Sequence, residues 1–285
     1  GAANWSNGFL PASHQGVPFH SASEPVRDLF PARAVPQGAD RDGRALVSLL
    51  DRMHLARHPG DDLLAARLRA AELAAAMQVS VPEAVDFADE PAWMLDAYGV
   101  GRDPTDDCGR RCLLARRLLE RGVRFVQIYS GGAFGGTPRH GWDGHEDNRE
   151  NHAREASLVD RPLAALVRDL KARGLLDDTV LLFTTEFGRT PFTQSAPDVL
   201  GAGRDHNPEG FAVWMAGAGL VPGIAHGATD EVGWRAVESP VTWPDLHATF
   251  LSLLGIDHER LVFYHDGIER RLTNVSGRPI EAILA

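Results

Sequence analysis

The chain has 285 residues, 44% of them hydrophobic and 24% charged, so it is long enough and apolar enough to fold around a sizeable core. Its 39 acidic residues exceed its 29 basic ones, for a formal net charge of −10 at pH 7, and no block of Lys or Arg stands out. This balance excludes the basic footprint of a nucleic-acid-binding protein, and we expect no nucleic-acid partner.

No apolar run reaches the roughly 20 residues that a membrane-spanning helix needs, so the sequence predicts a soluble chain without a membrane span. The N-terminus lacks the basic-then-apolar pattern of a signal peptide. Because the chain begins at Gly1 rather than at Met, an exported protein whose signal segment is absent from this chain stays an open alternative, and the localisation is unknown.

Residues 1–40 contain prolines at near-regular intervals, which defeat helix and strand periodicity and predict an irregular arm. Residues 41–121 are predicted to be mainly helical. Apolar residues recur at helical spacing over 43–77, with a break at Pro59-Gly60, which is typical of a helical hairpin. A further helix is predicted over 106–121, with a glycine directly after it.

Residues 122–285 differ in character, because apolar, β-rich runs alternate there with helical stretches. The runs occupy residues 123–129, 179–185 and 211–216. This alternation predicts the α/β class, with a mostly parallel sheet flanked by helices. Residues 242–255 predict a packing helix near the end. Since no linker divides the chain, we expect one domain over 1–285, with its α/β core and its site in 122–285.

Ligands of open parallel sheets gather outside the carboxyl ends of the strands, so the residues after each apolar run are candidates for chemistry. Asp143 and His145 come after the first run, and Glu186 directly follows the second. His206 lies in a glycine-flanked loop before the third. Carboxylate and imidazole groups bind zinc, manganese and similar divalent ions. The predicted metal ligands are therefore Asp143, His145, Glu186 and His206.

Two arginines lie close to these candidates, Arg189 and Arg204. A guanidinium fork suits bidentate contacts with an oxyanion, although a surface salt bridge is the ordinary alternative for each arginine. Taken alone, His206 is equally well explained as a loop histidine that is hydrogen-bonded to backbone, and Asp205 as a turn or cap residue. The reserve ligands are Asp205, His152 and His140.

Several motifs resemble those of a bacterial domain-of-unknown-function family, DUF1501, which is often labelled sulfatase-like. The motifs are Trp142-Asp-Gly-His, Glu186-Phe-Gly-Arg-Thr-Pro, Gly203-Arg-Asp-His-Asn-Pro, Gly227-Ala-Thr-Asp-Glu and Asp245-Leu-His-Ala-Thr. That family in turn resembles the alkaline phosphatase superfamily, which includes sulfatases. The resemblance implies the α/β fold of that superfamily, with helices in the N-terminal half.

The resemblance also implies roles for individual residues. Asp143 and His145 resemble the Asp and His of one metal site, Glu186 stands where the superfamily has a strand-end Asp, and His206 resembles a later histidine ligand. Phe187 occupies the place of a second-site ligand, so one metal or none is expected. No early strand with a nucleophile is found before residue 123. Either the chain is cut from a longer precursor or it lacks that part of the site.

The leading hypothesis is a metal-dependent hydrolase that acts on a small phosphate or sulfate ester, with an unidentified nucleophile. Its cofactor would be a divalent ion, with zinc, manganese, calcium and magnesium as candidates. The alternative is a non-catalytic, degenerate metal-binding, anion-binding or structural protein of the same fold. A third possibility is a fragment of an active enzyme that cannot work alone.

Overall fold

The computed structural model of the chain describes residues 7–8, 10, 14–20, 25–26, 35–61, 64–65, 67–69, 72, 81–130, 141–194 and 203–285. The chain divides into two compact units, Gly1–Glu90 and Pro91–Ala285. The single-domain organisation therefore stays a prediction. No helix in the described ranges is both long and apolar enough to cross a membrane.

The first unit contains α1 (Gln37–Arg57), which confirms the first arm of the predicted helical hairpin. Most of the second arm lies outside the described residues. The boundary of the irregular arm at residue 40 is wrong, because Pro36 is the residue that precedes α1. Proline is compatible with a helix start, where the missing N–H would have no partner within the helix.

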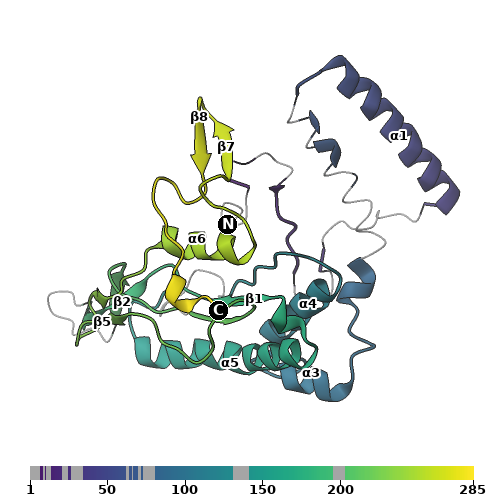
Figure 1. Ribbon diagram of the computed structural model, residues 1–285. Helices are drawn as coiled ribbons and strands as arrows, with labels where there is room; N and C mark the ends of the chain where they lie inside the picture. The colour runs from purple at the N-terminus through teal and green to yellow at the C-terminus, as the bar shows by residue number, and fades with distance from the viewer. Residues whose placement is uncertain are drawn as a thin grey trace. The chain divides into compact units, whose positions relative to one another are not determined.

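The second unit contains most of the described secondary structure. Its helices are α3 (Ala92–Tyr98), α4 (Asp106–Glu120), α5 (Asn148–Ala172) and α6 (Trp243–Leu253), with short 3₁₀ turns η3 (Leu175–Asp177) and η4 (Glu281–Ile283). The predicted helix over 106–121 is confirmed by α4, and Gly122 follows it in the left-handed conformation with φ of 82°. Figure 1 shows α5 running along one side of this unit, with α3 and α4 against its C-terminal half.

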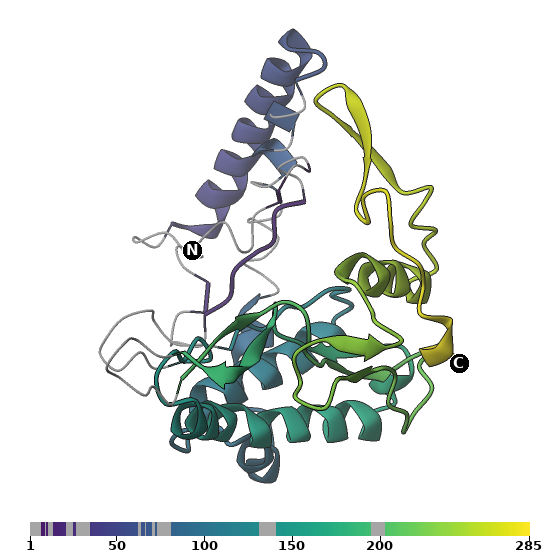
Figure 2. The ribbon, with the colours of Figure 1, turned by 90° about the vertical axis from the view of Figure 1, so that its left-hand side faces the viewer.

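In the described residues, eight short strands form four antiparallel pairs. They are β1 (Val180–Phe183) with β4 (Trp214–Gly217), β2 (Gly188–Thr193) with β3 (Arg204–Asn207), β5 (Ala228–Thr229) with β6 (Ala236–Glu238), and β7 (Val262–His265) with β8 (Ile268–Arg271). Figure 2 shows the β7–β8 hairpin standing out beyond α6. Every pairing in the described residues is antiparallel, so the mostly parallel sheet stays a prediction.

The three apolar runs have different outcomes. The second contains β1, and the third overlaps β4. These two strands pair with each other in register from Val180 with Gly217 to Phe183 with Trp214. Residues 123–129 form no strand, and Phe125 is 80% exposed. An apolar run becomes a strand only where a neighbour satisfies its backbone, and this segment has no strand partner among the described residues.

The apolar core of this unit lies between α3, α4 and α5. Tyr98, Cys112, Leu113 and Leu170 are fully buried there. Helix α6 adds buried Leu246, Ala248 and Thr249, and it confirms the helix predicted near the end of the chain. Its first turn carries a capping box, which satisfies backbone N–H groups that the helix itself leaves unpaired.

A partly buried charged network also connects α3, α4 and α5. Asp169 accepts a hydrogen bond from the Tyr98 hydroxyl at 3.0 Å and forms ion pairs with Arg116 at 3.0 Å and Arg173 at 2.7 Å. Glu120 lies 2.8 Å from Arg116 and 2.7 Å from Arg173. Burial and the adjacent Asp169 charge raise the pKa of Tyr98, so its hydroxyl stays protonated and donates.

Candidate metal site

The β2–β3 hairpin places one imidazole and two guanidinium groups on the same face. Arg189 of β2 and His206 of β3 are direct partners across the pair. Cross-strand partners share a face, and so do residues two apart along a strand, which adds Arg204 to this face. By the same alternation Asp205 lies on the opposite face. The backbone N–H of Asp205 donates to Thr190 Oγ1 at 3.1 Å.

The loop before α5 supplies the remaining groups of the cluster and is tied to the helix by one buried side chain. Asn151 is 7% exposed, and its amide donates to Gly141 O at 2.8 Å and accepts from Gly141 N at 3.3 Å. A Cβ on Gly144 would lie 2.1 Å from the Asn151 amide nitrogen. Asp147 caps the helix by accepting from Glu150 N. The turn containing Asp143 and His145 is therefore held at the N-terminus of α5.

Hairpin and loop meet in close backbone contact. A Cβ on Gly203 would lie 1.8 Å from His145 O, so only glycine fits at this point. Arg189 Nη2 donates to Trp142 O at 2.8 Å and to Asp143 Oδ1 at 3.0 Å, which fastens the loop to β2. These contacts bring residues about sixty positions apart in the chain together.

Three potential ligand atoms converge where the two segments meet. His206 Nε2 lies 2.7 Å from Asp143 Oδ1, His145 Nε2 lies 2.9 Å from the same oxygen, and the two Nε2 atoms are 3.1 Å apart. Asp143, His145 and His206 are thus a set whose ligand atoms all lie within 4.8 Å of one another. Their side chains are 31%, 20% and 40% exposed, so the cluster is open to solvent.

The electrostatics of the cluster keep Asp143 ionised. Partial burial by itself raises the pKa of this carboxyl, but hydrogen bonds from His206 and Arg189 and the His145 charge outweigh burial and lower the pKa to about 2. Asp143 is therefore anionic under all ordinary conditions. A permanent negative charge beside two imidazoles is a favourable setting for a cation.

The other predicted site residues lie apart from this cluster or outside the described residues. Glu186 is exposed and does not belong to the converging set. His152 Nε2 lies 3.4 Å from Trp142 O, and its ring is 5.8 Å from the Trp142 ring, so it contacts the loop rather than the ligand atoms. Arg204 Nη1 makes a long contact of 3.4 Å with Gly203 O. His140 lies outside the described residues.

Two further residues touch the cluster. The Phe187 ring lies 4.1 Å from the His206 ring and forms an apolar wall beside it. Gln194 Oε1 lies 2.7 Å from His145 Nδ1, and sequence reasoning missed this contact. Gln194 stands in no motif, and the contact joins residues 49 positions apart, so the sequence carries no local signal for it.

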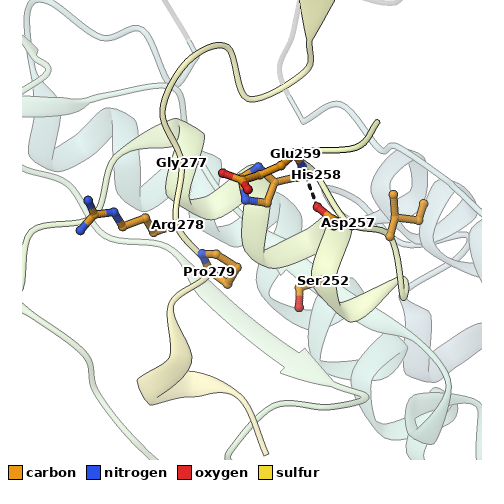
Figure 3. Close-up of a pocket in the computed structure, with 8 residues that line it drawn as sticks. Ser252, Asp257, His258, Glu259, Gly277, Arg278 and Pro279 are labelled. Atoms are coloured by element: carbon orange, nitrogen blue, oxygen red, sulfur yellow. Dashed lines mark hydrogen bonds between the residues drawn. The ribbon is translucent and has the colours of Figure 1, made fainter. Parts of the chain in front are cut away.

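A separate hollow lies beside the end of α6 and is lined by Ser252, Asp257, His258 and Arg278 among others (Figure 3). Its polar groups are engaged locally: Asp257 accepts from Glu259 N at 2.9 Å, and His258 Nδ1 lies 2.9 Å from Thr273 Oγ1. Figure 3 shows the Arg278 side chain extending away from His258. The hollow therefore lacks converging groups for a ligand, and the cluster on the hairpin is the stronger candidate.

Fold and site together describe a protein with an open His-His-Asp cluster at a hairpin–loop junction. The chain belongs to the family described as "Protein of unknown function (DUF1501)", whose profile matches residues 1–284. This confirms the family that the motifs indicated, whereas its placement among the sulfatase-like proteins of the alkaline phosphatase superfamily stays a prediction. No curated protein and no solved structure matches the chain.

Proposed function

We propose that the chain binds one divalent cation through Asp143, His145 and His206 and uses it in the hydrolysis of a phosphate or sulfate ester. The observation that carries the proposal is the convergence of one carboxylate oxygen and two imidazole nitrogens, from segments far apart in the chain, at mutual distances of 2.7 to 3.1 Å. Three such atoms form the protein part of many catalytic metal sites, in which a further position is left for water or substrate.

The spacing of the three atoms suits a single ion. A triangle with edges of 2.7, 2.9 and 3.1 Å has a circumscribed radius of roughly 1.7 Å, which is less than the about 2.0–2.2 Å of zinc–nitrogen and zinc–oxygen bonds. One ion can therefore touch all three atoms at once. Two imidazoles favour zinc or a similar transition metal over calcium and magnesium, which prefer oxygen ligands.

The surroundings favour one ion rather than two. Phe187 lies against the His206 ring at 4.1 Å and presents only carbon on that side. Glu186, the fourth predicted ligand, is exposed and lies outside the converging set. Under this proposal Glu186 is not a ligand of the ion.

The two arginines have different roles: Arg189 holds the site together, and Arg204 is available to contact the substrate. Arg189 is committed to the protein, because it donates to Asp143 and to the carbonyls of Trp142 and Arg204. Arg204 is half-buried on the same hairpin face and makes one long contact with Gly203 O. Arg204 is therefore the better oxyanion contact.

A bound divalent ion would supply a Lewis acid and acidify bound water.

A non-catalytic cation-binding module is the second candidate function. In the described part of the chain no Ser or Thr hydroxyl is hydrogen-bonded to Asp143, His145 or His206, and this observation favours a site without a protein nucleophile. The two candidates share the metal site and differ only in turnover. They are separated by assaying the metal-loaded protein.

The first experiment is elemental analysis of the purified protein before and after loading with zinc or manganese, in parallel with two variants. His206→Ala removes a ligand and should abolish stoichiometric metal. Asp205→Asn is the matched control, because Asp205 is adjacent in sequence but lies on the opposite face of β3, and the amide oxygen of Asn can still accept from His206 N. Wild-type protein that stays free of metal after loading would refute the proposal.

The second experiment measures hydrolysis of aryl phosphate and aryl sulfate by the loaded protein. Turnover that His206→Ala abolishes and Asp205→Asn preserves would support the hydrolase. Stoichiometric metal without turnover of either ester would favour the non-catalytic module. An Arg204→Ala variant should retain the metal but raise KM for the ester, because it loses an anion contact rather than a ligand.

A further inference from the structure

The His145 ring is in contact at both of its nitrogens. Nε2 lies in the cluster, 2.9 Å from Asp143 Oδ1 and 3.1 Å from His206 Nε2. Nδ1 lies 2.7 Å from the side-chain oxygen of Gln194. The side of the ring that faces away from the cluster is therefore contacted by Gln194, which is not one of the three ligand candidates.

The two contacts of the ring favour different tautomers. A carbonyl oxygen only accepts hydrogen bonds, so the contact with Gln194 favours a proton on Nδ1. The Asp143 carboxylate also only accepts, so in the metal-free protein it favours a proton on Nε2. When a cation takes the place of that proton, Nε2 must offer its lone pair, and only the Nδ1–H form that Gln194 favours can do so. In the opposite tautomer the lone pair of Nδ1 would face a lone pair of the Gln194 amide oxygen, and Nε2 would carry the hydrogen.

The β2–β3 hairpin holds Gln194 in place. Gln194 directly follows β2, and its backbone N–H donates to Gly203 O at 3.1 Å, just before β3. Gly203 in turn lies against the His145 carbonyl. The same hairpin supplies His206 on the Nε2 side of the His145 ring. The segments that pair as β2 and β3 therefore contact His145 at both ring nitrogens.

We infer that Gln194 is a positioning residue for the metal ligand His145: its amide oxygen accepts the Nδ1 proton, fixes the tautomer and orients Nε2 toward the ion. This inference rests on the proposed function, which it deepens by assigning a partner to one ligand. Partners of this kind orient metal-binding histidines, and their removal commonly weakens metal affinity by about 10–100-fold.

The test compares zinc affinity, measured by competition with a chromophoric chelator, in three variants. Gln194→Leu keeps the size of the side chain and removes the acceptor, so its Kd should rise by about tenfold or more. Gln194→Glu can only accept, so it should bind zinc as tightly as wild type or more tightly. Phe192→Leu, on the same strand with its ring 5.2 Å from Trp234, controls for general damage to the hairpin.

A second readout does not need the metal. Long-range proton–nitrogen NMR spectra of the metal-free protein, recorded where histidine is neutral, report which nitrogen of His145 carries hydrogen. We expect a larger share of the Nδ1–H form in wild type and in Gln194→Glu than in Gln194→Leu, where only the Asp143 contact at Nε2 remains. A purely structural role for Gln194 would leave this signature unchanged.

The outcomes separate this inference from the proposed function. Zinc bound equally by wild type and Gln194→Leu would overturn the role of Gln194 and leave the metal site standing. Loss of affinity in Gln194→Glu with a normal Phe192→Leu would show that the amide must donate, and would also overturn it. If wild type binds no zinc, the proposed function fails, and equal shares of the Nδ1–H form in wild type and Gln194→Leu would then overturn the hydrogen-bond assignment as well.

Discussion

Asp169 and Asp143 are each contacted by three polar side chains, yet one forms a closed site and the other an open one. The Asp169 carboxylate is 6% exposed and is contacted by two arginines and a tyrosine hydroxyl. The Asp143 carboxylate is 31% exposed and is contacted by one arginine and two imidazoles. The two sites differ in depth and in the chemistry of their donors.

This difference shows what distinguishes a structural carboxylate from a ligand. Arginine and the protonated tyrosine can only donate hydrogen bonds to the Asp169 carboxylate. They offer no lone pair, so they cannot join Asp169 in binding a cation. An imidazole can donate or can offer a lone pair, so His145 and His206 can turn from partners of Asp143 into its fellow ligands. Solvent exposure then gives the ion a path of entry.

The largest effect is expected for Asp169→Ala. It leaves Arg116, which is 3% exposed, without its Asp169 partner and removes the acceptor of the Tyr98 hydroxyl. Breaking a buried pair from one side costs about 3–5 kcal/mol, and we expect a loss of this size in the free energy of unfolding, measured in urea. Asp160→Ala, an exposed change on the same helix, is the control. Equal losses in both variants would show that the network adds no stability.

Asp143→Ala should have a small effect on stability and a large effect on zinc binding. The metal-free protein should lose only about 1 kcal/mol, because the ion pair with Arg189 is partly exposed. Zinc affinity should fall by about 100-fold or more, since one of three ligands is gone. Unfolding in urea and chelator competition measure the two quantities. A loss of stability as large as that of Asp169→Ala, with unchanged zinc binding, would make both aspartates structural.

Gly203→Ala tests whether the open cluster depends on the close approach of hairpin and loop. The added Cβ would stand 1.8 Å from His145 O, so one segment must move. We expect a stability loss of about 1–3 kcal/mol together with weaker zinc binding. Gly38→Ala in α1, where nothing lies within 4 Å of the added carbon, should leave zinc affinity unchanged and should not lower stability, because alanine suits a helix better than glycine. Unchanged zinc affinity in Gly203→Ala would separate the cluster from this contact.

Sequence reasoning located the helices well because their signals are local. The predictions of α4 and α6 depended on apolar spacing and on the glycines that end them, and the structure confirms both. Residues 123–129 looked like a strand on apolar content alone, but a strand also needs a partner, which the run itself does not contain. The α/β architecture stays a prediction for the same reason.

The residues of the candidate site likewise fall into those that the sequence indicated and those that it did not. Asp143, His145 and His206 stand in polar, glycine-flanked motifs, so the sequence marked them, and the structure brings them together. Glu186 was chosen because it follows a strand, yet the chain turns so that it is exposed outside the set. Gln194 was missed, because its contact with His145 depends on the path of the β2–β3 hairpin.

The smallest effect concerns a third carboxylate, Asp245, which has backbone and hydroxyl partners in place of the side-chain cations around Asp143 and Asp169. Its oxygens accept from Thr242 N at 2.9 Å, from the Thr242 hydroxyl at 2.6 Å and from Arg278 N at 2.8 Å. Partial burial raises the pKa of Asp245, but these hydrogen bonds and the Arg278 charge outweigh it, so the pKa lies below its ordinary value.

A lowered folded-state pKa means that Asp245 stabilises the protein above the unfolded value of about 3.9 and that this stabilisation is lost as the pH falls through the folded pKa. Asp245→Asn keeps the shape and cannot titrate. The wild type should therefore exceed the variant in unfolding free energy by up to about 1 kcal/mol at neutral pH, with the gap shrinking in acid. Urea unfolding of both proteins at several pH values measures the gap. A gap that stays constant from neutral to acid pH would mean that the Asp245 charge contributes nothing, and that hydrogen-bond geometry alone stabilises this cap.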